Sequence, residues 1–120
     1  MKMWESATMI FYILSVVVVL VTLIFNYFLF KVDVLPTGSM EPTINHRSIV
    51  FAQHTFNHPI KENKVILFYD PLKEINVIHR VRGYYYSGDK LFYLTKGDNN
   101  KYFDPPTDSS LVYGVVFIKI

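Results

Sequence analysis

The chain has 120 residues, a formal net charge of +2 and no cysteine, and 51% of its residues are hydrophobic. This length allows one domain with a modest core, and the small, scattered positive charge argues against a nucleic-acid-binding protein. Without cysteine the chain has no disulfide, no thiol nucleophile and no cysteine-based zinc site.

An uncharged apolar segment of 23 residues, 8–30, comes first along the chain. As a helix rising ~1.5 Å per residue it would span ~34 Å, enough to cross a hydrocarbon core of ~30 Å. The alternative is a cleaved secretory signal, but the segment is too long for that, and no small-x-small pair follows it before Lys31. The sequence therefore predicts a short N-terminus over residues 1–7, a transmembrane helix over 8–30 and a separate domain over 31–120.

The stretch "PTGSMEPTI", residues 36–44, follows this segment. Gly38 and Pro42 disfavour a regular helix there, and Pro36 and Pro42 disfavour a central strand. Ser39 is therefore expected in a stiff, irregular loop.

Ser39 is a candidate nucleophile close to the membrane. Nine residues take the chain from Phe30 to Ser39, and at ~3.3–3.6 Å per residue they reach at most ~30 Å. A catalytic serine there would meet membrane-tethered substrates. The alternative is a turn serine whose hydroxyl bonds its own backbone.

The remainder of the chain, 32–120, is typical of a small antiparallel β domain. Short runs rich in β-branched and aromatic residues, several of them alternating, occupy residues 48–53, 64–69, 76–86, 90–95 and 111–120. Turn-forming residues such as Asp70-Pro71 and Ser87-Gly88-Asp89 separate these runs. The predicted fold class is mainly β, with one N-terminal transmembrane helix before a small antiparallel β domain.

A serine nucleophile needs a base, and His79 is the strongest candidate among four histidines. In the strand predicted over 76–86, His79 shares a face with Val77 and Val81, whereas Arg80 points the other way. A rigid strand would then present one imidazole on an apolar face. The alternative is a core histidine with no catalytic role.

The other histidines, His46, His54 and His58, lie in turn-rich segments. His54 and His58 are four residues apart, the spacing of a helical metal pair, but no helix is expected there and no third ligand is evident. The sequence predicts neither a metal site nor a cofactor.

A histidine base also needs an acid that holds its tautomer. The stretch "TKGDNNKYFD", residues 95–104, offers Asp98 and Asp104, six residues apart on a Gly-Asp-Asn-Asn turn. The alternative is a hairpin turn in which Asp98 only caps the backbone.

In this order, "GSMEPTI", "SIVFA", "VIHRV" and "TKGDNNKYFD" resemble the successive sequence boxes of signal peptidase I. These membrane-bound serine peptidases remove signal peptides, and the resemblance covers residues 33–104 and the preceding anchor. The usual bacterial branch has a lysine base where this chain reads Ile78-His79-Arg80. Histidine there is similar to the endoplasmic-reticulum-type branch, which also occurs in archaea and some Gram-positive bacteria.

The resemblance implies that Ser39, His79 and Asp104 form the catalytic set, with Asp98 a second important carboxylate. It implies an oxyanion site made by the N–H of Ser39 with support from the Thr37 hydroxyl. The substrates would be signal peptides of membrane-tethered preproteins, cut after small residues and bound in extended form at a strand edge.

The resemblance also implies a single-pass protein of the cell membrane, with a cytosolic N-terminus and an extracytoplasmic catalytic domain. Its partners would be the bilayer and neighbours in the Sec pathway, and its oligomeric state and its preproteins are left open. One rival hypothesis is a catalytically inactive, membrane-anchored β-module that binds a partner protein. Another is a LexA-like self-cleaving protein, which needs a lysine base and which the membrane span disfavours.

Overall fold

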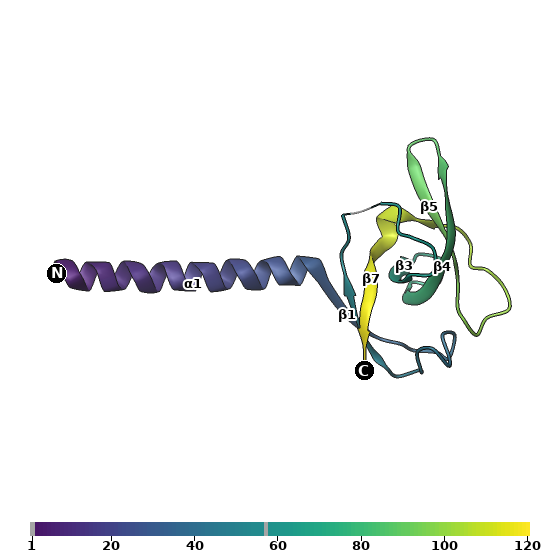
Figure 1. Cartoon of the computed structure of the whole chain (residues 1–120), viewed down its shortest axis with the longest axis horizontal. Coiled ribbons are helices and arrows are strands. Elements are labelled where there is room, and N and C mark those ends of the chain that lie inside the picture. Colours follow the sequence, from purple (N-terminus) through teal and green to yellow (C-terminus); the bar gives the residue numbers. More distant parts are fainter. Residues whose placement is uncertain (1, 57) are drawn as a thin grey trace.

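A computed structural model describes residues 2–56 and 58–120. Figure 1 shows the helix α1, Met3–Leu29, as a long rod that leads into the first strand of a β domain. None of its residues is buried, and the helix is long and apolar enough to cross a membrane. It begins five residues before the predicted start and ends one residue before the predicted end, because Phe30 already belongs to a strand.

Four polar side chains within α1 are satisfied by the helix itself. The hydroxyls of Thr8, Ser15 and Thr22 and the amide of Asn26 each donate to the backbone carbonyl four residues earlier, over 2.8–2.9 Å. Such bonds remove unpaired polar groups from an apolar environment. The helix surface is therefore compatible with lipid along its whole apolar length.

The β domain is one seven-stranded antiparallel sheet in the order β1-β2-β7-β3-β4-β5-β6. This confirms the predicted fold class. The strands are β1 Phe30–Val34, β2 Ile49–Gln53, β3 Val65–Asp70, β4 Ile75–Ser87, β5 Lys90–Lys96, β6 Thr107–Asp108 and β7 Val112–Lys119, with a short 3₁₀ helix η1 at Ser109–Leu111.

The five predicted strands correspond to β2, β3, β4, β5 and β7, with each end within one residue of its expected position. The sequence analysis missed β1 and β6. β1 continues from α1 without a turn that would mark its start, and β6 has only two residues, too few for an alternating pattern.

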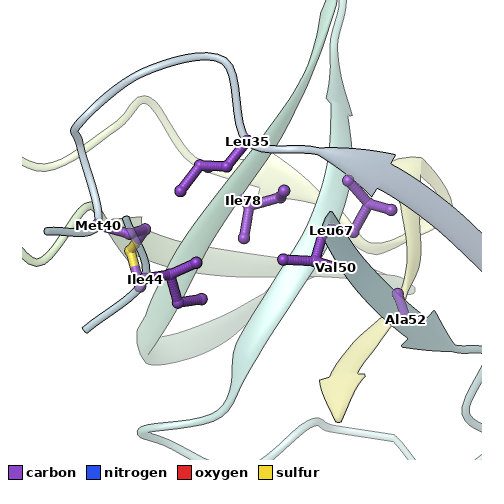
Figure 2. Close-up of a cluster of buried hydrophobic side chains, with 7 residues drawn as sticks. All are labelled: Leu35, Met40, Ile44, Val50, Ala52, Leu67 and Ile78. Carbon is purple, nitrogen blue, oxygen red and sulfur yellow. The ribbon is translucent and has the colours of Figure 1, made fainter. Parts of the chain in front are cut away.

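Buried side chains form two clusters on opposite faces of the sheet. In β3, Ile66 and Phe68 belong to one cluster and Leu67 to the other, as the alternation of a strand requires. In Figure 2 the second cluster includes Leu35, Met40 and Ile44, which come from the loop between β1 and β2 and point toward Ile78 and Val50 of the sheet. The irregular loop predicted around Ser39 is therefore anchored by buried apolar side chains.

The first half of β4 has a free backbone edge in the described part of the chain. Its residues 75–80 pair with β3 on one side, but the pairing with β5 on the other side begins only at Arg80. His79 lies at the end of this unpaired edge, next to the loop that carries Ser39.

Candidate active site

Ser39 lies half-buried in the loop between β1 and β2. Its neighbour Met40 is fully buried, and the N–H of Ile44 donates to the Met40 carbonyl over 3.0 Å. The buried side chain of Met40 thus fixes the backbone beside Ser39.

Ser39, His79 and Asp104 form a hydrogen-bonded series, although 40 and 25 residues separate the bonded pairs. The Nε2 atom of His79 is 3.1 Å from Oγ of Ser39, and its Nδ1 atom is 2.5 Å from Oδ2 of Asp104. A carboxylate only accepts, so Nδ1 carries the proton and Nε2 is free to accept from the serine hydroxyl. This is the geometry of a nucleophile, a base and an orienting acid.

The imidazole of His79 is shielded from water, and the Asp104 carboxylate is partly shielded. The side chain of His79 is 8% exposed and that of Asp104 is 18% exposed. The ring of Phe68 lies edge-on to the imidazole, with centroids 6.3 Å apart. Electrostatic interactions between these groups are therefore stronger than they would be in bulk water.

Thr37 lies against both polar atoms of the nucleophile. Its hydroxyl donates to Oγ of Ser39 over 3.1 Å and accepts from the N–H of Ser39 over 3.4 Å. The hydroxyl and the backbone N–H are therefore two donors close to the oxygen that would attack a carbonyl, as an oxyanion site requires.

The turn at residues 97–100 holds the nucleophile's backbone from another direction. Asn99 donates from its N–H to the Ser39 carbonyl over 2.8 Å, and from its side-chain amide to the Gly38 carbonyl over 3.1 Å. Gly97 allows this approach, since a Cβ atom on it would lie 2.6 Å from the Ser39 carbonyl oxygen. The contact between turn and loop therefore depends on glycine at this position.

Asp98 lies outside the Ser39–His79–Asp104 series. Its two carboxylate oxygens accept from Nε and Nη2 of Arg80 over 2.8 and 2.7 Å, and Arg82 lies 3.8 Å away. The Arg80 hydrogen bonds lower the pKa of Asp98 to about 2, with burial opposing them. His79 and Arg80 project from opposite faces of β4, so His79 binds Asp104 and Arg80 binds Asp98.

The sequence analysis overlooked Thr95, a fully buried threonine in β5. Its hydroxyl donates to Oδ2 of Asp104 over 2.7 Å, and its carbonyl accepts from the Asp104 N–H over 2.9 Å. A signal was present, because Leu91 and Tyr93 are the other buried members of the same alternating row, and a polar residue in such a row needs a partner.

The other histidines have different neighbours. His46 lies 2.5 Å from the Glu41 carboxylate on the surface, His58 lies 3.2 Å from the Tyr93 hydroxyl, and the His54 ring packs against Phe56. Of the four histidines, His79 is the one that contacts the candidate nucleophile.

A cleft of about 210 Å³ opens beside Ser39 and His79. One wall is the loop after β1 and the other is the unpaired half of β4; the lining residues are Leu35, Pro36, Thr37, Ser39, Lys73, Ile75, Asn76, Val77, Ile78, His79 and Asn100. A larger hollow of about 290 Å³ lies by His54 and Ser109. The cleft is set apart by the reactive groups at its end rather than by its volume.

Comparison with known proteins identifies one family over residues 6–97 of the chain. Residues 6–97 match a family described as "Signal peptidase, peptidase S26". The chain is 40% identical over 68 residues to the signal peptidase complex catalytic subunit SEC11 of Debaryomyces hansenii, and 40% identical over 70 residues to that of Saccharomyces cerevisiae. SEC11 of Clavispora lusitaniae is 37% identical over 67 residues. Each match covers 56% of this chain and 40% of the relative, so the matched part spans about two fifths of the relatives' length.

The Asp98–Arg80 pair predicts a pH-dependent contribution to stability. The carboxylate is 14% exposed and its pKa falls from 3.8 to about 2 on folding, so Asp98→Asn should lower the free energy of unfolding by about 2 kcal/mol at pH 7. Because the folded pKa is depressed, this contribution is complete above about pH 4 and is lost as the pH falls toward 2. Urea unfolding in detergent micelles across this range measures it.

The matched control is Asp89→Asn, on the exposed β4–β5 turn. It should change the free energy of unfolding by less than about 0.5 kcal/mol at every pH. A destabilisation by Asp98→Asn that stays constant down to pH 2 would contradict the ion-pair explanation.

Proposed function

This chain belongs to the signal peptidase family, peptidase S26, and we propose that it is a membrane-anchored serine endopeptidase. In this proposal it removes signal peptides from preproteins. The matches to SEC11 subunits confirm the resemblance to the endoplasmic-reticulum-type branch. One observation carries the proposal, namely the hydrogen-bonded series Ser39–His79–Asp104 at the end of a strand-lined cleft.

The proposed reaction is acyl transfer. Oγ of Ser39 attacks the carbonyl carbon of the scissile peptide bond while its proton passes to Nε2 of His79. Asp104 keeps the Nδ1 proton in place and stabilises the imidazolium that forms. The tetrahedral intermediate then expels the new amine, which takes the proton from His79. With His79 again as base, water attacks the carbonyl carbon of the acyl-Ser39 ester; the C–Oγ bond breaks, the cleaved peptide leaves with its new carboxyl group, and His79 returns the proton to Oγ of Ser39.

The negative oxygen of the tetrahedral intermediate is proposed to bind the N–H of Ser39 and the hydroxyl of Thr37. In the free protein the N–H of Ser39 makes only a long hydrogen bond of 3.4 Å to Thr37, so little interaction is lost when it turns to a substrate. The Thr37 hydroxyl would exchange its 3.1 Å hydrogen bond to Oγ of Ser39 for one to the oxyanion as Oγ forms its bond to the carbonyl carbon. Each donor of this kind is typically worth ~3–4 kcal/mol to the transition state.

The substrate is proposed to bind as an added strand along residues 75–79 of β4. Their unpaired backbone edge offers main-chain hydrogen bonds, and the cleft beside it is walled by Leu35, Ile75 and Ile78. A cleft of about 210 Å³ shared by several substrate positions favours small side chains. This supports cleavage after small residues.

The cleft is proposed to work at the membrane surface. β1 begins at Phe30 directly after α1, and the N–H of His54 donates to the Leu29 carbonyl over 2.7 Å, which ties the helix end to the sheet. We propose a single-pass orientation in the cell membrane, with residues 1–7 cytosolic and residues 31–120 outside, where preproteins emerge. The bilayer and neighbours of the Sec pathway are the partners this placement implies.

The alternative function is a catalytically inactive, membrane-anchored β-module that binds a partner protein. A binding module has no need of a serine and an aspartate that each lie within 3.1 Å of the same histidine. Cleavage of a preprotein separates the two hypotheses.

The hydroxyl of Ser39 is expected to be essential for cleavage. The purified full chain in lipid vesicles, mixed with a preprotein that bears a signal peptide, should release the mature protein with one new N-terminus. Ser39→Ala should fold and insert normally yet lose cleavage, because only the nucleophilic oxygen is removed from a loop. Mass spectrometry of the products measures both results.

Ser87→Ala, at the exposed end of β4, is the control and should cleave like the unaltered chain. Turnover retained by Ser39→Ala in a contaminant-free preparation would refute Ser39 as the nucleophile. Binding of preprotein without any cleavage by the unaltered chain would favour the inactive module.

The two aspartates are expected to differ in their effect on turnover. Asp104→Asn removes the acceptor for the Nδ1 proton, favours the wrong tautomer of His79 and should lower kcat on the order of 10⁴-fold, as in other serine triads. Asp98→Asn loosens the turn, and it should lower kcat far less than Asp104→Asn does at temperatures where the variant stays folded. Initial cleavage rates of both variants measure the difference. A larger loss of kcat in Asp98→Asn than in Asp104→Asn would mean that Asp98, not Asp104, orients His79.

A further inference from the structure

We propose that Thr95 is a positioning residue that holds the Asp104 carboxylate against His79; the proposal rests on the function proposed for this site. Thr95 lies in β5 opposite Val81 of β4 and is fully buried. It does not line the substrate cleft, so any effect it has on the reaction must pass through other residues.

Asp104 needs an external support because its own segment supplies none. Residues 97–106, between β5 and β6, contain no strand or helix in the structure. Thr95 holds Asp104 at two points, accepting from its N–H over 2.9 Å and donating to its Oδ2 atom over 2.7 Å. A rigid strand residue thus fixes both the backbone and the carboxylate of an irregular segment.

Both donors meet on the same carboxylate oxygen. Oδ2 of Asp104 accepts from the Thr95 hydroxyl and from Nδ1 of His79. The Asp104 side chain is 18% exposed, so water is available to compete for it. Without the Thr95 hydroxyl, rotation toward water would cost the carboxylate only its bond to His79, and the imidazole would lose its fixed orientation.

The methyl and the hydroxyl of Thr95 have separable roles. The β-branched side chain restricts χ1, and its methyl fills a buried position of the sheet. Valine keeps this shape and removes the hydroxyl, whereas serine keeps the hydroxyl and removes the methyl. A packing role and a positioning role therefore predict opposite outcomes for the two substitutions.

The test compares the cleavage kinetics of Thr95→Val, Thr95→Ser and the unaltered chain in vesicles. A hydrogen bond to a charged group is worth enough that Thr95→Val should lower kcat about 10- to 100-fold, with KM unchanged. Thr95→Ser should recover kcat to within about threefold of the unaltered chain. Thr107→Val, at another buried threonine of the sheet, is the matched control and should leave kcat unchanged.

A double variant asks whether Thr95 acts through Asp104. In the Asp104→Asn background, adding Thr95→Val should lower kcat less than about twofold further, because the two residues form one unit. Independent multiplication of the two losses would overturn the proposal. Equal kcat for Thr95→Val and the unaltered chain, or a loss that serine does not restore, would also overturn it while leaving the proposed function intact.

A spectroscopic measurement keeps the inference testable if the unaltered chain does not cleave, in which case the proposed function itself fails. The hydrogen-bonded Nδ1 proton of His79 should give a far-downfield ¹H resonance in micelles, assigned by its absence in His79→Ala. Thr95→Val should broaden or shift this resonance and Thr95→Ser should restore it. An unchanged resonance in Thr95→Val would overturn the positioning role.

Discussion

The imidazole of His79 is held between a loop serine and a loop aspartate, and both loops depend on strand β4. His79 is hydrogen-bonded to Ser39 and Asp104 on one face of β4, while Arg80 is hydrogen-bonded to Asp98 on the other. The stretch 95–104 is thereby fixed at both of its carboxylates. Asn99, in the turn at residues 97–100, then holds the backbone of Ser39 through a hydrogen bond to its carbonyl. The geometry at the serine thus follows from successive residues of one strand that project to opposite sides.

The second constraint is the direct passage from helix to strand. With Leu29 in α1 and Phe30 in β1, no flexible linker separates the sheet from a helix that is long and apolar enough to cross a membrane. In Figure 1, β1 and β7 lie next to the helix end, and the β4–β5 hairpin lies farther from it. The same strand continues into the loop of Ser39, whose apolar side chains are buried on the sheet as Figure 2 shows. Burial and a short connection together hold Ser39 at a fixed distance from the end of α1, and would hold it at a fixed height above a bilayer in the orientation proposed above.

Periodicity predicted the fold well because its main elements are long enough to show a pattern. The helix, the five longer strands and the facing of His79 away from Arg80 all follow from spacing along the chain. The short strands β1 and β6 and the partner of each aspartate do not, because they depend on contacts between distant residues. Spacing does not distinguish Asp98 from Asp104. The resemblance to signal peptidase I assigned Asp104 to the set with His79, and in the fold Asp104 contacts His79 and Asp98 contacts Arg80. The alternation of β5 marks Thr95 as an inward-facing polar residue, but only the fold shows that the partner of its hydroxyl is Asp104.

The central claim is that Ser39, activated by His79, forms the covalent bond to the substrate. A peptide ester that carries a signal-peptide cleavage sequence should acylate the chain faster than the acyl group is hydrolysed, so that the intermediate accumulates. Acid quenching followed by peptide mass mapping should find the acyl group on Ser39, and His79→Ala should abolish it. An acyl group on another residue, or equal labelling of Ser39 in His79→Ala, would contradict the mechanism.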